Sequence, residues 1–137
     1  MKNKENMKNK IDDSVDNFKN PTFFKALKNA LRGIKLVILS ERNIKIQLVI
    51  TAMIIIMGFL FKINLAEWLI LTITIFLVLI TECLNTAVEK TVDMITTKYS
   101  KSAKNVKDIS AGAVLFSAIA SIVVGIIIFL PKALALF

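Results

Sequence analysis

The chain of 137 residues contains no histidine, one cysteine and only four glycines. Without histidine, a Ser-His-Asp triad, imidazole metal ligands and a histidine proton switch are all excluded. The single cysteine, Cys83, cannot form a disulfide within the chain, and a thiolate zinc site needs several sulfurs. The four glycines are widely separated, so no glycine-rich phosphate loop of the Walker or protein-kinase type is present. Any catalysis must therefore use carboxylates, amides, hydroxyls or lysines.

Charged residues are also scarce, at 20% of the chain, whereas hydrophobic residues reach 55%. This composition lies outside the range of ordinary soluble proteins, so we expect a membrane protein, and the length predicts one domain. Three apolar stretches stand out, at Ile44–Phe61, Trp68–Thr81 and Ile109–Leu130. A helix needs about 20 residues to cross a hydrocarbon core of about 30 Å, which the first and third stretches provide or nearly provide.

The middle apolar stretch is too short to span a membrane by itself, but its helical pattern continues. No glycine or proline follows it as far as Ile95, and the apolar spacing remains that of a helix. We therefore expect one long helix over about residues 66–96, whose second half leaves the bilayer. With spans at about 43–62 and 108–131, the fold class is an all-α membrane protein with three transmembrane helices.

The positive charges are distributed unevenly around these spans. Residues 1–45 contain 11 lysines and arginines and residues 90–107 contain five, whereas the other two exposed segments contain only Lys62 and Lys132. The positive-inside rule then places the N-terminus and the second loop in the cytoplasm. The first loop and the C-terminus are expected outside the cell.

The segment before the first span combines apolar and basic residues at helical spacing. Its apolar residues recur at i, i+4, i+7 and i+8 from Phe23, while Lys25, Lys28 and Arg32 fall mostly between them. This pattern predicts a basic amphipathic helix at about residues 21–39, lying on the cytoplasmic membrane surface. Residues 1–20, rich in Lys, Asn and Asp, are predicted to form a disordered tail, which leaves residues 21–137 as the membrane domain.

Polar residues interrupt the apolar pattern of the long helix and share one side of it. On a helical wheel they fall within about 100° of arc. They are Glu82, Asn85, Thr86, Glu89, Asp93 and Thr96. Because a carboxylate inside a membrane helix costs several kcal/mol, such a stripe indicates a functional site. The alternative is the solvated end of a helix that leaves the membrane, and it stays open above all for Asp93 and Thr96.

Further polar residues stand just before the other two spans and are expected at the same depth. Glu41 precedes the first span, and Lys107 and Asp108 precede the third. For Glu41, a simple helix-end charge beside Arg42 is the alternative. Carboxylates and amides are the hard oxygen ligands that Mg²⁺ prefers, and a lysine beside them can hold a phosphate as a point charge. Phosphoryl transfer needs these elements together with a base near the attacking hydroxyl.

Small residues follow one face of the third span. They are Ser110, Ala113, Ser117, Ser121 and Gly125. Small side chains let membrane helices approach closely, so we interpret this face as a packing surface rather than a catalytic one.

Two motifs in the chain resemble the small integral-membrane prokaryotic diacylglycerol kinases. One is Glu82-Cys-Leu-Asn-Thr-Ala-Val-Glu-x-x-x-Asp93, and the other is Ala103-Lys-x-x-Lys-Asp-Ile-x-Ala-Gly-Ala-Val114. Gly33 and the segment Ser40-Glu41-Arg42-Asn43 also fit, so the likeness covers about residues 22–130. The Glu-x-Asn and Ala-Gly-Ala-Val elements are similar to the Gram-positive branch, whose members mostly act as undecaprenol kinases. This chain has Gln47 and Ser100 where that branch often has histidine.

The resemblance implies a homotrimer in a bacterial cell membrane, with active sites that subunits can share. It implies a kinase that transfers the γ-phosphate of ATP, with Mg²⁺, to the hydroxyl of a membrane lipid alcohol. Undecaprenol is favoured and diacylglycerol comes second. We expect no nucleic-acid partner.

The same resemblance assigns roles by position. Glu82 matches the general base for the lipid hydroxyl, and Glu41 and Glu89 match the carboxylates that hold Mg²⁺-ATP. The other expected nucleotide contacts are Lys25, Asn85, Asp93, Lys98, Tyr99, Ser100, Lys107 and Asp108.

Two other classes of protein are compatible with some of these residues. A small cation- or proton-coupled transporter would also carry acids along a transmembrane stripe. Here, however, the acids gather at one membrane face instead of the midplane, and the chain has no internal repeat of the kind common in transporters. If the chain were a non-catalytic membrane adaptor with a basic surface helix, the presence of Glu82 in an apolar helix would have no explanation.

Overall fold

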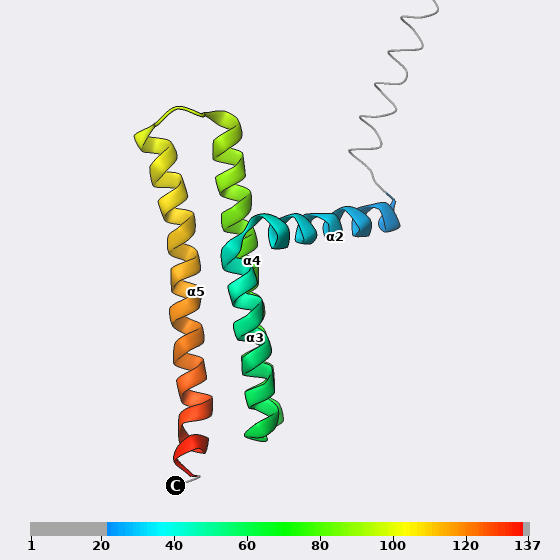
Figure 1. Cartoon of the computed structure of the whole chain (residues 1–137), viewed down its shortest axis with the longest axis vertical. Helices are drawn as coiled ribbons and strands as arrows, with labels where there is room; N and C mark the ends of the chain where they lie inside the picture. Colours follow the sequence, from blue (N-terminus) through cyan, green and yellow to red (C-terminus); the bar gives the residue numbers. More distant parts are fainter. Residues whose placement is uncertain (1–21, 136–137) are drawn as a thin grey trace, which may run out of the picture. The chain divides into compact units, whose positions relative to one another are not determined.

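The computed structural model describes residues 22–135, and these residues form helices joined by short turns (Figure 1). In chain order the helices are α2 (Phe23–Ser40), α3 (Arg42–Leu60), α4 (Leu65–Ile95) and α5 (Lys101–Leu134). The all-helical expectation is confirmed. The predicted tail at residues 1–20 lies outside the described residues.

The chain divides into two compact units, Met1–Leu36 and Val37–Phe137. The described part of the first unit is most of α2, which forms where the sequence predicts a helix. The position of this helix on a membrane surface stays a prediction. The second unit contains α3, α4 and α5.

Each of α3, α4 and α5 is long and apolar enough to cross a membrane. They contain 19, 31 and 34 residues, so α4 and α5 exceed the length that a hydrocarbon core requires. Helix α5 begins seven residues before the span expected at about residue 108, because Ser100 caps it. The Ser100 hydroxyl accepts a hydrogen bond of 3.5 Å from the Ala103 amide.

A tight turn joins α3 to α4 and is fixed by a capping box. The Asn64 side chain accepts a hydrogen bond of 2.9 Å from the Glu67 amide, and the Glu67 carboxylate accepts one of 2.7 Å from the Asn64 amide. Glu67 also lies 3.1 Å from the ammonium group of Lys132 near the end of α5. The start of α4 is therefore joined to the end of α5.

The buried apolar cluster of this unit lies at the same end. It comprises Ile63, Leu71, Ile128 and Phe129. Helix α4 packs against α5 and more sparsely against α3, and Figure 1 shows α4 and α5 side by side, joined at their opposite end by a loop. Most other large apolar side chains are exposed, as suits helices surrounded by lipid.

Toward the opposite end of α4 and α5, which carries the loop of residues 96–100, the buried side chains are largely polar. They include Glu82, Asn85, Thr86 and Ser117. Burial of a polar group costs free energy unless it is hydrogen-bonded, so this concentration needs an explanation beyond packing. Glu82, Asn85 and Thr86 belong to the polar stripe that the sequence indicates, whereas Ser117 lies on the small-residue face of α5.

Candidate active site

Glu82 lies in the middle of α4 and only 2% of its surface is exposed. Its Oε2 accepts a hydrogen bond of 3.2 Å from Nε2 of Gln47 on α3. The sequence marks Gln47 only as a departure from a family pattern and does not predict this contact. Only the packing of α3 against α4 reveals that Gln47 faces Glu82, because no local sequence pattern relates positions on two different helices.

The other end of the Gln47 amide is unusual. Its Oε1 is buried and accepts no hydrogen bond from any residue in the described part of the chain. A buried acceptor without a donor is costly, and such groups concentrate at sites where a ligand or water completes the network. Beside Glu82, Gln47 therefore has a donor, Nε2, that is hydrogen-bonded and an acceptor, Oε1, that is not.

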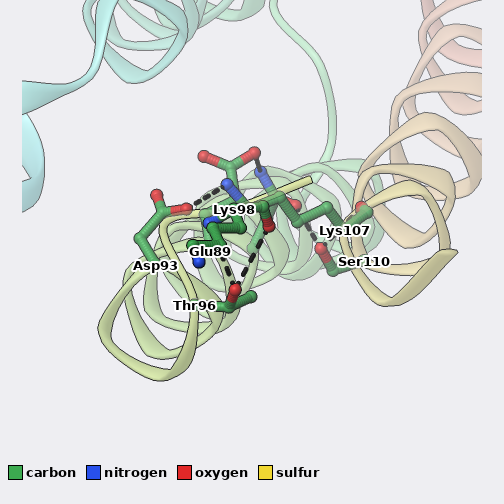
Figure 2. A network of polar contacts seen from close by, with 7 residues as sticks. Glu89, Asp93, Thr96, Lys98, Lys107 and Ser110 are labelled. Carbon is green, nitrogen blue, oxygen red and sulfur yellow. Dashed lines mark hydrogen bonds and ion pairs between the residues drawn. The ribbon is translucent and has the colours of Figure 1, made fainter. Parts of the chain in front are cut away.

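Asn85 connects Glu82's helix to α5 one turn further along. Its Nδ2 donates a hydrogen bond of 3.2 Å to Oε1 of Glu89, and its Oδ1 accepts one of 2.6 Å from the Ser110 hydroxyl. Figure 2 shows Ser110 on α5 directed toward the α4 residues of this network. The expectation for Ser110 was packing alone, and its pairing with Asn85 depends on the register between α4 and α5, which no sequence pattern states.

Asp93 and Lys107 form an ion pair across the same two helices. Their oxygen and nitrogen lie 2.6 Å apart, and Figure 2 shows the two side chains meeting beside the loop. Next to them, Lys104 pairs with Asp108 within α5. Of these four residues, Lys104 was missed as a site residue, although it stands inside the second motif.

A cavity of about 390 Å³ opens at this loop. It brings together six of the predicted nucleotide contacts, namely Asp93, Lys98, Tyr99, Ser100, Lys107 and Asp108. Lys104 also lines it. The three lysines share the cavity with Asp93 and Asp108, and each lysine ammonium group can hold a phosphate as a point charge.

Glu41 is half-buried at the N-terminal end of α3, and its carboxylate lies 3.6 Å from the ammonium group of Lys90. This pair brings the start of α3 to the turn of α4 that carries Glu89. In residues 22–135, however, no three or more acidic or cysteine side chains gather as a cation site. The assignment of Glu41 and Glu89 to Mg²⁺ stays a prediction.

Lys25 lies on α2 in the first unit and is exposed. Its contribution to a nucleotide site in the second unit stays a prediction as well.

With this geometry established, the chain can be compared with known proteins. Residues 28–129 match the family described as prokaryotic diacylglycerol kinase. The chain belongs to this family. An undecaprenol kinase of Bacillus subtilis is 42% identical to this diacylglycerol kinase family member over 110 residues, which cover 80% of this chain and 89% of the relative.

A diacylglycerol kinase of Synechocystis is 34% identical to this family member over 117 residues. That alignment covers 85% of this chain and 67% of the relative. The resemblance drawn from the two motifs is therefore confirmed. Membership in a family of kinases also decides against the transporter and adaptor alternatives.

Proposed function

We propose that this chain is an ATP-dependent kinase that phosphorylates the hydroxyl of undecaprenol in a bacterial cell membrane. Family membership makes the chain a lipid kinase. The choice of undecaprenol over diacylglycerol rests on the relative with 42% identity, which is named an undecaprenol kinase. Diacylglycerol is the second candidate, because the relative with 34% identity is named a diacylglycerol kinase.

The observation that carries this proposal is the buried Glu82 carboxylate with Gln47 attached to one of its oxygens. A general base must lie within hydrogen-bonding reach of the hydroxyl proton that it removes. The Gln47 N–H holds Oε2, so we assign Oε1 of Glu82 to the lipid hydroxyl. The Oε1 atom of Gln47, which accepts no hydrogen bond in the described residues, is available to a donor from the substrate or from a water molecule.

The cavity at residues 96–100 is the proposed site of the nucleotide. Lys98, Lys104 and Lys107 supply the positive charge for its phosphates. In the structure Lys104 and Lys107 are each paired with an aspartate, so those contacts must be exchanged for contacts with phosphate oxygens. Both pairs are largely exposed to solvent, which makes the exchange inexpensive.

Glu41 and Glu89 are the proposed protein ligands of Mg²⁺. Their oxygens fit this ion, because Mg²⁺ in nucleotide sites usually takes one or two carboxylates and completes its shell with phosphate and water. Asn85 holds only one oxygen of Glu89, and the Glu41 carboxylate accepts a hydrogen bond of 3.1 Å from the Ser40 hydroxyl and lies 3.6 Å from the Lys90 ammonium group. When bound, the ion would neutralise charge on the transferred and leaving phosphates.

The proposed topology places the N-terminus and the α4–α5 loop in the cytoplasm and the C-terminus outside. The concentration of lysine in residues 90–107 supports this orientation. A lipid alcohol with its hydroxyl at the membrane surface then reaches Glu82 from the bilayer, while ATP arrives from the cytosol. The proposed assembly is a homotrimer, in which exposed apolar helix faces pack against other copies.

Purified protein in detergent tests the proposal directly. It is supplied with Mg²⁺-ATP and with undecaprenol or diacylglycerol in separate reactions, and phosphorylated lipid is measured. We expect phosphate incorporation into undecaprenol at the higher kcat/KM, and none with Glu82→Gln. A higher kcat/KM for diacylglycerol would overturn the substrate assignment, and no product from either lipid would overturn the proposed reaction.

A further inference from the structure

Ser110 on α5 stands at the end of a chain of hydrogen bonds that leads to Glu89. Its hydroxyl donates to Asn85 Oδ1 over 2.6 Å, and Asn85 Nδ2 donates to Glu89 Oε1 over 3.2 Å. Asn85 is buried, with 9% of its surface exposed. The three side chains therefore form one connected unit across the α4–α5 interface.

The chemistry of the groups fixes the direction of this chain. An ionised carboxylate only accepts hydrogen bonds, so the amide nitrogen of Asn85 must be the atom that faces Glu89. The amide oxygen then faces α5 and needs a donor there, because a buried acceptor left without one is costly. Ser110 is the donor that α5 provides.

The Ser110 hydroxyl has a second acceptor within reach. The backbone oxygen of Lys107, one turn earlier in α5, lies 2.9 Å from Ser110 Oγ. A hydroxyl has one proton, so the two acceptors share it, and the shorter contact is the one to Asn85. The Lys107 carbonyl also takes part in the backbone hydrogen bonding of the helix, whereas Asn85 Oδ1 has no other donor in residues 22–135.

We propose that Ser110 is a positioning residue for cation binding. By holding the Asn85 amide in one orientation, it keeps Glu89 Oε1 engaged and so presents Oε2 to the metal. This inference rests on the proposed function, in which Glu89 binds Mg²⁺. It differs from a packing role, because it predicts an effect on metal affinity that a loss of packing alone would not produce.

The chain offers a matched control in Ser117. Its hydroxyl lies 2.8 Å from the hydroxyl of Thr81, so Ser117 also joins α5 to α4 through a side-chain hydrogen bond. Ser117 is buried, with 5% of its surface exposed, and in the described part of the chain it forms no hydrogen bond with the acidic residues of α4. Ser117→Ala thus removes an equivalent interhelical contact and leaves Asn85 untouched.

The experiment measures metal affinity in two ways for the wild type, Ser110→Ala, Ser110→Thr and Ser117→Ala. The first is the Mg²⁺ concentration that gives half-maximal lipid phosphorylation. The second is equilibrium binding of Mn²⁺, followed by electron paramagnetic resonance in the presence of a non-hydrolysable ATP analogue. The second readout does not depend on turnover.

For Ser110→Ala we expect both values to rise about tenfold, the usual effect of removing a residue that orients a metal ligand. Ser110→Thr keeps the hydroxyl and should return both values to within about threefold of the wild type. Ser117→Ala should leave both unchanged. The rate of Ser110→Ala at saturating Mg²⁺ should stay within about twofold of the wild type, which shows that the variant is folded.

Unchanged Mn²⁺ binding in Ser110→Ala would overturn the inference, and so would an equal change in Ser117→Ala. Either result obtained with an active wild type leaves the proposed function intact. A wild type that phosphorylates neither lipid instead removes the proposed function itself, and the role of Ser110 with it.

Discussion

The Gln47 amide on α3 donates its hydrogen bond of 3.2 Å to the carboxylate of Glu82 on α4, so the proposed base is held by a neutral residue from a neighbouring span. This relationship defines what each partner contributes. In the proposed function, Glu82 supplies the group that accepts a proton, and Gln47 fixes which of the two carboxylate oxygens is available.

Replacing Glu82 with glutamine should remove the base and leave the size of the side chain almost unchanged. General bases contribute about 10²–10⁴ in rate, so we expect turnover to fall by at least 100-fold while binding of Mg²⁺-ATP persists. Rate is measured by phosphorylated lipid and binding by a fluorescent ATP analogue. Glu67→Gln, at the other end of the same helix, is the control and should keep its rate. A Glu82→Gln enzyme of near-normal rate would exclude this role.

Replacing Gln47 with glutamate should change the pH dependence of the reaction. Two carboxyl groups in contact resist simultaneous ionisation, so the pair retains a proton up to a higher pH than a single acid would. Because the base must be unprotonated, the loss of activity at low pH should begin at a higher pH than in the wild type. The measurement is a pH profile of kcat.

Gln47→Leu is the matched control for that profile, because it removes the amide N–H without adding an acid. Its rate should fall, but its acidic limb should move less than that of Gln47→Glu. Coincident profiles for the wild type and Gln47→Glu would show that residue 47 does not interact with the Glu82 carboxylate during turnover.

Replacing Lys107 with alanine should weaken ATP binding. A hydrogen bond to a charged group contributes about 1.5–3 kcal/mol, which corresponds to a rise of roughly tenfold to 100-fold in KM for ATP. Lys132→Ala also removes a lysine from an ion pair, in this case with Glu67 at the opposite end of α4. It should leave KM for ATP unchanged. Equal effects of the two substitutions would indicate a general loss of charge instead of a phosphate contact.

Replacing Gly58 with alanine should destabilise the fold. A Cβ atom at this position would lie 2.7 Å from Cη2 of Trp68, which is too close for any contact between side chains. Overpacking of this kind costs about 1–3 kcal/mol, measurable as a lower free energy of unfolding in detergent by circular dichroism. Gly125→Ala is the control, since a Cβ there meets no atom within 4 Å. A Gly58→Ala protein as stable as the wild type would contradict the packing of Trp68.

The sequence allowed the helices and the polar side of α4 to be predicted, because both follow from the 3.6-residue period of a helix. The loop contacts from Lys98 to Ser100 followed from the family motif and are gathered at one cavity. The partners across helices did not follow. Gln47 meets Glu82, and Ser110 meets Asn85, only after the rotation and register of neighbouring helices are set. Those two variables depend on the packing of the whole unit, and no local pattern reports them.

The N-terminal end of α5 also could not be predicted from hydropathy. The apolar pattern begins near Ile109, whereas the helix begins at Lys101 because of a polar cap at Ser100. Hydropathy locates the part of a helix that lipid surrounds, and capping residues locate its true end. The additional turns carry Lys104 and Lys107, which line the cavity.

The buried apolar cluster at Ile63, Leu71, Ile128 and Phe129 lies near the start of α4 and the end of α5, away from Glu82, Glu89 and Asp93. Its branched side chains and the Phe129 ring pack together and hold this end of the helices in place. In the proposed function, the contacts that must be exchanged lie toward the other end, where phosphate and hydroxyl groups of the substrates can replace the partners in hydrogen bonds and ion pairs. Admission of a bulky lipid need not loosen the part of the protein that keeps it folded.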